Sequence, residues 1–267
     1  MGLKLGSLRF IGLGLFDEKG ISVNGLEIAR SADTVLLESY TNLMPGLNIA
    51  SLEAMLGKKV QLATRRYVED GREILAQAKA KDLAMLVAGD PFVATTHVDL
   101  RLRAARMGIP VEVVNAPSII SVAPGAAGLQ NYKFGRSATI TFPEPYSDVP
   151  YDALKFNRSA GLHTLFFLDL KVEEQRYMSV NEGIDILLSM EQRRREGVVH
   201  EGLIFVGVAR AGGPLQFIKA GKAEDLLKTN FGGPPQLLMV PGRLHFMEAE
   251  ALIAFAGAEK ELAEANI

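Results

Sequence analysis

Residues 83–97 read LAMLVAGDPFVATTH and join a short apolar run to a turn that carries polar groups. Residues 83–87 are apolar throughout, as expected for a strand that is buried on both faces of a parallel sheet. Asp90 follows this run, and Pro91 restricts the backbone after it. Helical spacing then extends over 97–107. The stretch predicts a strand–loop–helix unit with a carboxylate at the end of the strand.

Strands and helices alternate on both sides of this unit, which is typical of βαβ repeats. In the N-terminal half we predict strands at 8–13, 34–38, 60–63 and 111–114, and helices at 22–32, 49–56 and near 73–80. Asn48 and Gly57 suit the start and the end of the second of these helices.

The C-terminal half repeats the alternation after a change of composition. Residues 115–129 are rich in Ala, Gly, Pro and Ser, so we predict a domain boundary there, with domains at 1–116 and 117–267. Ser179 and Glu182 form a capping-box pattern that opens a further helix. The other predicted elements are strands at 138–142, 164–168, 203–208, 216–219 and 237–240 and helices at 151–160, 223–229 and 246–256. The predicted fold is α/β, with two tandem α/β domains whose sheets are mostly parallel.

Composition excludes several classes of protein. Hydrophobic residues make up 48% of the 267 residues and charged residues 22%, which rules out intrinsic disorder. With 29 basic and 31 acidic side chains there is no basic excess for nucleic acid, and we read Arg193–Arg195 as a solvated helix end. No apolar run reaches the roughly 18–20 residues that span a bilayer. We therefore expect a soluble, cytoplasmic protein that binds neither nucleic acid nor membrane.

The sequence contains no motif that is typical of a metal site or of a hydrolase. The chain has no cysteine, and its four histidines, at 97, 163, 200 and 245, lack the spacing of metal ligands. No phosphate-binding P-loop and no serine nucleophile elbow is present. We therefore expect no metal.

Three loops follow predicted strands and are the places where a ligand would bind, because open parallel sheets bind ligands beyond the carboxyl ends of their strands. These loops are residues 11–17, 88–96 and 115–120. Each also has a purely structural interpretation, as a glycine turn, as a turn with Thr96 capping a helix, and as a helix entry. The first loop has Asp17 where a dinucleotide-binding fingerprint needs its third glycine, which weakens an NAD-binding interpretation.

Six segments together resemble a known family. They are FIGLGLFDEKGISVNGLEIARSADTV at 10–35, VAGDPFVATTH at 87–97, APSIIS at 116–121, LHTLFFLDLK at 162–171, VARAGG at 208–213 and PPQLLMVPGRLHFMEAE at 234–250. From Arg9 to Ile267 the chain resembles the tetrapyrrole-methylase-like class of S-adenosylmethionine methyltransferases. The GDP motif is shared by the wider class, including the corrin and sirohaem methylases, whereas the combination is closer to the diphthine-forming branch.

The resemblance implies a function. S-adenosylmethionine would bind in a cleft between the two domains of a homodimer and leave as S-adenosylhomocysteine. The partner would be translation elongation factor 2, one of whose histidines carries a 3-amino-3-carboxypropyl group. Three methylations of its amino nitrogen would give diphthine, a step of diphthamide biosynthesis.

The resemblance also implies the cofactor contacts, and every one lies near a predicted strand end. They are Leu15, Asp90, Val93, Ser118, Ile119, Leu168, Ala211 and Gln236. Histidine is familiar at the last position, so Gln236 is a departure from the family. We assign no catalytic residue, because about a tenth of an α-amino group is already neutral at pH 7.

Three alternatives stay open at this stage. The chain could be another methylase of the class, acting on a tetrapyrrole or on the ribose of ribosomal RNA. It could be an NAD-binding oxidoreductase. It could also be a non-catalytic module that keeps the ligand site for regulation.

Overall fold

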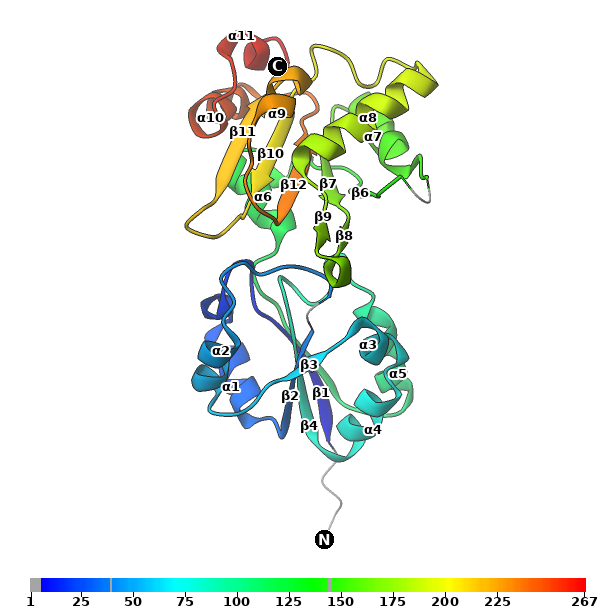
Figure 1. Cartoon of the computed structure of the whole chain (residues 1–267), viewed down its shortest axis with the longest axis vertical. Coiled ribbons are helices and arrows are strands. Elements are labelled where there is room, and N and C mark those ends of the chain that lie inside the picture. The colour runs from blue at the N-terminus through cyan, green and yellow to red at the C-terminus, as the bar shows by residue number, and fades with distance from the viewer. Residues whose placement is uncertain (1–5, 39, 144–145) are drawn as a thin grey trace. The chain divides into compact units, whose positions relative to one another are not determined.

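The computed structural model describes residues 6–38, 40–143 and 146–267, and the chain divides into two compact units (Figure 1). Unit 1 comprises Met1–Ile119 and unit 2 comprises Ile120–Ile267. Each unit has a five-stranded sheet and an apolar core of its own. The α/β fold class is confirmed. The domain boundary predicted after residue 116 stays a prediction, and the units are described separately below.

Unit 1 is built on a parallel sheet. Its strands are β1 (Ser7–Gly12), β2 (Thr34–Glu38), β3 (Gln61–Ala63), β4 (Asp82–Val87) and β5 (Val111–Val114), in the order β3-β2-β4-β1-β5. Its helices are α1 (Val23–Ser31), α2 (Ile49–Leu56), α3 (Arg65–Asp70), α4 (Arg72–Ala80) and α5 (His97–Arg106), with a 3₁₀ turn η1 (Glu18–Gly20). All four strand pairings of this sheet are parallel, as the sequence predicted.

Helices cover both faces of this sheet, with α1 and α2 on one side and α3, α4 and α5 on the other (Figure 1). Two apolar clusters fill the two interfaces, one around Phe10, Ile74 and Leu100 and the other around Ile11 and Leu52. Neighbouring residues of β1 thus point to opposite faces, which explains why the strand is apolar at consecutive positions.

The predicted helix boundaries in unit 1 follow from local chemistry. Asn48 caps α2, since its side chain accepts a hydrogen bond from the Ser51 amide at 3.0 Å. Gly57 ends the helix in the left-handed conformation, with φ of 71°. Both predictions are confirmed.

Unit 2 has a mixed sheet, and here the expectation of a mostly parallel sheet is wrong. Its strands are β6 (Ala138–Ile140), β7 (Thr164–Leu168), β10 (Phe205–Ala209), β11 (Phe217–Gly221) and β12 (Gln236–Val240), in the order β11-β10-β12-β7-β6. The β6–β7 pair is parallel, whereas the other three pairings of this sheet are antiparallel. A small hairpin, β8 (Leu170–Lys171) and β9 (Arg176–Tyr177), follows β7.

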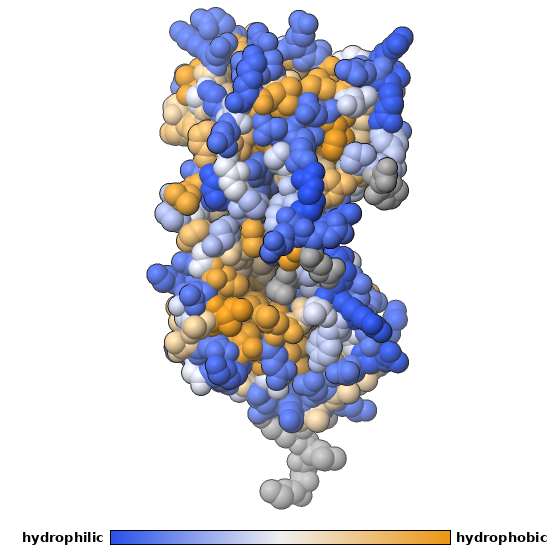
Figure 2. All heavy atoms as spheres, in the orientation of Figure 1, coloured by the Kyte–Doolittle hydropathy of each residue, from blue (hydrophilic) through white to orange (hydrophobic). Residues whose placement is uncertain are grey.

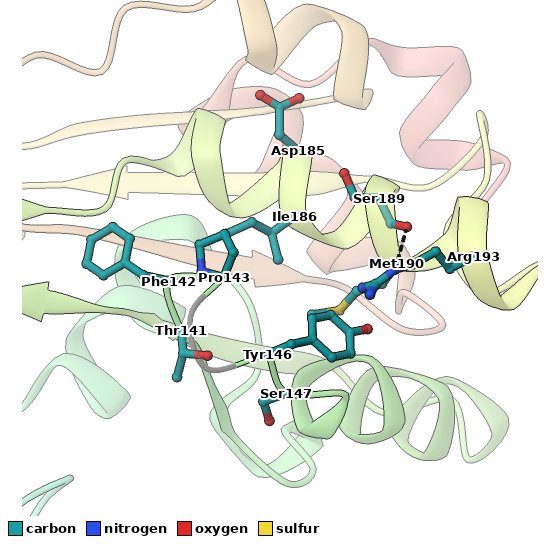
Figure 3. Close-up of a pocket in the computed structure, with 10 residues that line it drawn as sticks. All are labelled: Thr141, Phe142, Pro143, Tyr146, Ser147, Asp185, Ile186, Ser189, Met190 and Arg193. Carbon is teal, nitrogen blue, oxygen red and sulfur yellow. Dashed lines mark hydrogen bonds between the residues drawn. The ribbon is translucent and has the colours of Figure 1, made fainter.

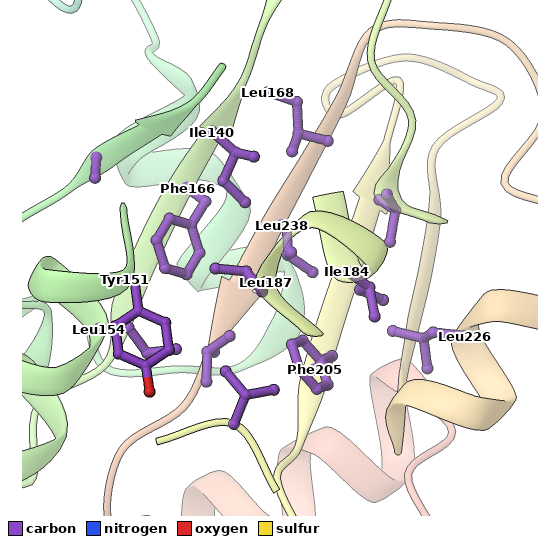
Figure 4. Close-up of a cluster of buried hydrophobic side chains, with 14 of the residues drawn as sticks. Ile140, Tyr151, Leu154, Phe166, Leu168, Ile184, Leu187, Phe205, Leu226 and Leu238 are labelled. Atoms are coloured by element: carbon purple, nitrogen blue, oxygen red, sulfur yellow. The ribbon is translucent and has the colours of Figure 1, made fainter. Parts of the chain in front are cut away.

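The helices of unit 2 are α6 (Ile119–Ala127), which starts at the last residue of unit 1, α7 (Val149–Ser159), α8 (Val180–Arg194), α9 (Ala223–Lys228), α10 (Phe246–Ala256) and α11 (Lys260–Glu264), with 3₁₀ turns η2 (Asn131–Lys133) and η3 (Val172–Glu174). Of these, α7, α8 and α9 contribute to a large apolar core on the sheet (Figure 4). In the core, Ile184 and Leu187 of α8 belong with Phe166, Phe205 and Leu238 of the sheet. The predicted Ser179–Glu182 capping box opens α8 and is confirmed.

No helix was assigned over 119–127, although a helix entry was one interpretation of the third loop, and Pro124 and Gly125 both disfavour a helix interior. Proline has no amide hydrogen, so the carbonyl of Ile120, four residues earlier, loses its helical partner. The Asn131 side-chain amide donates to that carbonyl at 2.8 Å. A side chain from outside the helix thus supplies the missing hydrogen bond.

A buried ionic network joins residues near the start of unit 2 to the segment between β12 and α10. His163 and Glu248 are 0% and 1% exposed, and the imidazole Nε2 lies 2.9 Å from a Glu248 oxygen. The Gly242 amide donates to Nδ1 at 2.9 Å, so Nδ1 carries no proton and Nε2–H donates to the carboxylate. Lys133 and the backbone amides of Gln130 and His245 also donate to Glu248.

The pKa values of this pair follow from its surroundings. Burial lowers the pKa of His163, and the Glu248 hydrogen bond opposes this only in part. Burial alone would raise the pKa of Glu248, but the hydrogen bonds from His245, Lys133, Gln130 and His163 outweigh it and bring the pKa to about 2. The native network is therefore a carboxylate next to a neutral imidazole.

We predict that acid destabilises the protein in two stages because of this network. Below a pH of about 6.5 the unfolded chain binds a proton on His163 before the folded chain does, so the free energy of unfolding falls. Below about 4.5 the same holds for Glu248. Urea unfolding at several pH values should show His163→Gln to be less stable at pH 7.5, with a weaker pH dependence between pH 7 and 5. An unchanged slope in the variant would contradict this assignment.

Candidate functional site

The loops that follow β4, β1 and β5 lie at one edge of the sheet of unit 1, because these three strands are parallel neighbours. The first two loops are joined through their backbones. The Gly14 amide donates to the Gly89 carbonyl at 3.3 Å, and the Gly89 amide donates to the Gly14 carbonyl at 2.7 Å. Both glycines have positive φ, 77° and 71°, which side-chain-bearing residues rarely adopt. Two of the three predicted ligand loops thus form one paired structure.

The third loop packs against this pair at Gly12. A Cβ atom on Gly12 would lie 2.6 Å from the Gly89 carbonyl oxygen and 2.6 Å from the Ala116 Cβ. The loops after β1, β4 and β5 therefore meet at a point where no side chain fits.

Asp90 bridges two of these loops. One carboxylate oxygen accepts from the Phe92 amide at 3.1 Å, and the other accepts from the Asn115 side-chain amide at 2.8 Å. The residue is partly exposed, and each ionised carboxylate oxygen has a second lone pair. Asp90 is thus held in place and can still accept hydrogen bonds from a ligand.

The other four predicted contacts of unit 1 lie in the same loops. Leu15 follows Gly14, and the Val93 amide bonds to the Asp90 carbonyl at 3.3 Å. Ser118 is buried in the loop after β5, and Ile119 begins α6. Five of the eight predicted residues are therefore carried by three neighbouring loops.

Leu168, Ala211 and Gln236 lie at one edge of the sheet of unit 2. Leu168 is the last residue of β7, Ala211 follows the end of β10, and Gln236 is the first residue of β12. Because β12 is antiparallel to both neighbours, its start lies beside their ends, and Gln236 pairs with Ala209. Gln236 therefore reaches this edge from the start of a strand and not from its end.

The Gln236 side chain is engaged within unit 2. Its oxygen accepts from the Val180 amide at the start of α8 at 2.9 Å, and its nitrogen donates to the Gly232 carbonyl at 2.8 Å. This glutamine thus ties α8 and the loop before β12 to the sheet edge.

Sequence reasoning missed two residues that hold these loops. One is Asn115, the partner of Asp90. The other is Arg210, which has a positive φ of 50° and donates to the carbonyls of Leu215, Phe231 and Gly233. A polar residue next to a strand end was the available signal at both positions.

Unit 2 also contains a pocket of about 310 Å³, near the lower limit for small-molecule sites (Figure 3). The Arg193 guanidinium lies 3.7 Å from the centre of the Tyr146 ring at its rim. No predicted cofactor residue lines it; the lining consists of Thr141, Phe142, Pro143, Tyr146, Ser147, Asp185, Ile186, Ser189, Met190 and Arg193. Phe142 nevertheless donates its amide to Asp169, the residue after Leu168, at 3.1 Å.

On the face drawn in Figure 2, hydrophobic residues gather in one area of unit 1 with hydrophilic residues around it, and both kinds are present on unit 2. Within the described ranges, no helix combines the length and apolar character needed to cross a membrane. No group of three or more His, Asp or Glu residues in the same ranges is placed to hold a metal ion.

Comparison with known proteins identifies the family. A family model described as Tetrapyrrole (Corrin/Porphyrin) Methylases matches residues 7–227. A diphthine synthase of Methanosarcina barkeri is 48% identical over an alignment of 259 positions, which covers 94% of this chain and 96% of the relative. A crystal structure of a diphthine synthase has a TM-score of 0.88 and 38% identity, covering 96% of this chain and 98% of that one.

The chain belongs to the diphthine synthase family. A further member, from Methanocaldococcus jannaschii, is 44% identical over 90% of this chain and 95% of its own length. The resemblance inferred from the motifs is confirmed, and the protein is a methyltransferase. Family membership favours this branch over the other methylases of the class and over an NAD-binding oxidoreductase.

We predict that Gly12→Ala disrupts the meeting point of the three loops. The added methyl group has backbone on one side and Ala116 on the other, so the loops must separate, and the free energy of unfolding should fall by about 1–3 kcal/mol. Gly125→Ala is a matched control, since nothing lies within 4 Å of its added Cβ and alanine favours a helix. Urea unfolding of both variants checks this. Equal stability of the two would show that the loops have room to adjust.

Proposed function

We propose that this diphthine synthase family member transfers methyl groups from S-adenosylmethionine to the amino nitrogen of a 3-amino-3-carboxypropyl group on a histidine of translation elongation factor 2. Three transfers to one nitrogen give diphthine, and the reaction takes place in the cytoplasm. The observation that carries the proposal is the Asp90 carboxylate, held between the loops after β4 and β5 with lone pairs to spare. Family membership supplies the reaction class.

The two sheet edges suit the cofactor in their chemistry. Asp90 can accept from ribose hydroxyls and can stabilise a nearby positive charge, and S-adenosylmethionine carries both groups. Backbone groups at Leu15, Ile119 and Ala211 can bind the adenine and the methionine end. The other four proposed cofactor contacts are the apolar Val93 and Leu168 and the polar Ser118 and Gln236.

The protein's part in the reaction is to position the two reactants. The cofactor supplies an activated methyl group, and the acceptor amine needs only to be neutral. An α-amino group has a pKa of about 7.7–8.0, so a usable fraction is neutral at pH 7 without a protein base. Bringing two reactants together in the right geometry can contribute roughly 7–11 kcal/mol. The third methylation leaves a quaternary nitrogen, which cannot react again.

We predict that the purified protein methylates elongation factor 2 that carries the histidine intermediate. Mass spectrometry should show products with one, two and finally three added methyl groups when S-adenosylmethionine is present. Asp90→Ala removes a carboxylate from the proposed cofactor site, so calorimetry should show about tenfold weaker binding of S-adenosylhomocysteine, with correspondingly slower methylation at low cofactor concentration. No mass increase in the factor with the wild-type protein would rule out the proposed substrate.

We also propose that the protein is a homodimer, the commonest form of closed assembly. Exposed apolar side chains on α10 are consistent with a contact surface, because Met247 and Phe255 are 58% and 65% exposed and lie eight residues apart on one helix. Light scattering at micromolar concentration should give twice the chain mass of 28.9 kDa. A mass of one chain would reject the dimer.

A further inference from the structure

His97, at the start of α5, is buried against the loop that carries Asp90. Its side chain is 0% exposed, and Nδ1 lies 3.0 Å from the Pro91 carbonyl oxygen. A carbonyl oxygen only accepts, so Nδ1 carries a proton and donates it to this bond. The histidine thus holds the peptide that directly follows Asp90.

The Pro91 carbonyl accepts hydrogen bonds from the other end of the loop. It also accepts from the Thr95 hydroxyl at 2.7 Å, so two side chains from the end of the loop bond back to its beginning. Ala94, which lies between Pro91 and Thr95, has a positive φ of 55°, an unfavourable conformation for a residue with a Cβ. Hydrogen bonds from Thr95 and His97 offset the cost of that conformation.

The other side of the His97 ring faces the end of β2. Nε2 is 3.8 Å from a Glu38 oxygen, and it has no hydrogen-bond partner among the described residues. Glu38 is itself fixed, since its carboxylate accepts from the amides of Tyr40 and Thr41 at 2.6 and 2.7 Å. The ring therefore packs against an anchored group of the neighbouring strand.

Aromatic side chains fix the ring in the remaining directions. The ring of Phe10, in β1, lies 6.2 Å from the His97 ring and 5.1 Å from that of Phe92, and Tyr40 meets His97 edge to face at 6.5 Å. His97 thus has contacts with β1, with the residues after β2 and with the loop after β4. A side chain with so many fixed neighbours can hold a loop in one conformation.

We propose that His97 is a positioning residue for cofactor binding: its bond to Pro91 holds the loop after β4 so that Asp90 is preorganised. This inference rests on the proposed role of Asp90. It differs from a role as catalytic base, because the ring is buried and Nδ1 is already a donor. It follows that loss of the bond raises the KM for the cofactor and leaves kcat at saturating cofactor close to that of the wild type.

Two isosteric variants separate the two ends of the ring. In His97→Asn the amide nitrogen can occupy the place of Nδ1 and donate to Pro91, whereas in His97→Gln it occupies the place of Nε2 and faces Glu38. We expect calorimetry with S-adenosylhomocysteine to show affinity within about threefold of wild type for His97→Asn and about tenfold weaker for His97→Gln. Leu52→Ala, in the apolar cluster on the opposite face of the sheet, serves as a control for general loss of stability. It should lower the melting temperature and leave affinity unchanged.

Amide hydrogen exchange tests the same inference without the cofactor. The amides of Phe92 and Val93 bond to Asp90, so they should exchange about tenfold faster in His97→Gln than in the wild type and in His97→Asn. Equal affinities and exchange rates in the two variants, or a greater loss in His97→Asn, would overturn the positioning role. If the wild-type protein failed to bind S-adenosylhomocysteine, the proposed function would fail, and the exchange rates would still decide whether His97 holds the loop.

Discussion

The direct backbone contact between Gly14 and Gly89 is the constraint on which the site of unit 1 depends. Two amide–carbonyl bonds form an isolated antiparallel bridge just beyond the parallel strands β1 and β4, and the Leu13 amide donates to the Val87 carbonyl at 2.8 Å next to it. Gly14 and Gly89 are needed here for their positive φ, whereas Gly12 is needed for lack of space, because a Cβ on it would lie 2.6 Å from both the Gly89 carbonyl oxygen and the Ala116 Cβ. Because the loops meet through backbone, their separation is set by hydrogen-bond lengths and not by adaptable side chains. The Asp90 carboxylate, which one of these loops carries, is therefore fixed in position relative to the sheet.

Much of the fold could be predicted because its signals are local. Apolar runs, the cap at Asn48 and the capping box at Ser179 depend on a few neighbouring residues, and the structure confirms them. The direction of strand pairing in unit 2 depends on residues far apart in the chain. Helix α9 joins β11 to β12, which run in the same direction as a crossover requires, but β10 lies between these two strands and is antiparallel to both. Helix α6 could not be predicted from local signals for a related reason. Asn131, which lies outside the helix, supplies the hydrogen bond that Pro124 removes.

The site was predictable only in part, for similar reasons. The position of Asp90 directly after an apolar run indicated a ligand-facing carboxylate, and the loop geometry agrees with that interpretation. That Asn115 holds it could not be predicted without the strand order, which places β5 next to β1. Gln236 was selected through resemblance alone. Its amide bonds to Val180 and Gly232, so the role of its side chain at the sheet edge is at least partly structural.

Each of the four histidines has a polar contact within the fold. His163 lies between Gly242 and Glu248, His245 accepts from the Met247 amide, and His200 lies 2.9 Å from an Arg158 nitrogen. With His97 bonded to Pro91, each of the four imidazoles has a contact within the fold. General base catalysis needs a group within hydrogen-bond reach of the proton it removes, and His97 and His163, which are buried, are poorly placed for that. The proposed methyl transfer does not need such a base, because the substrate amine can lose its proton to water. Rigid loops that fix the reacting groups are therefore the feature of this structure that most directly serves the proposed reaction.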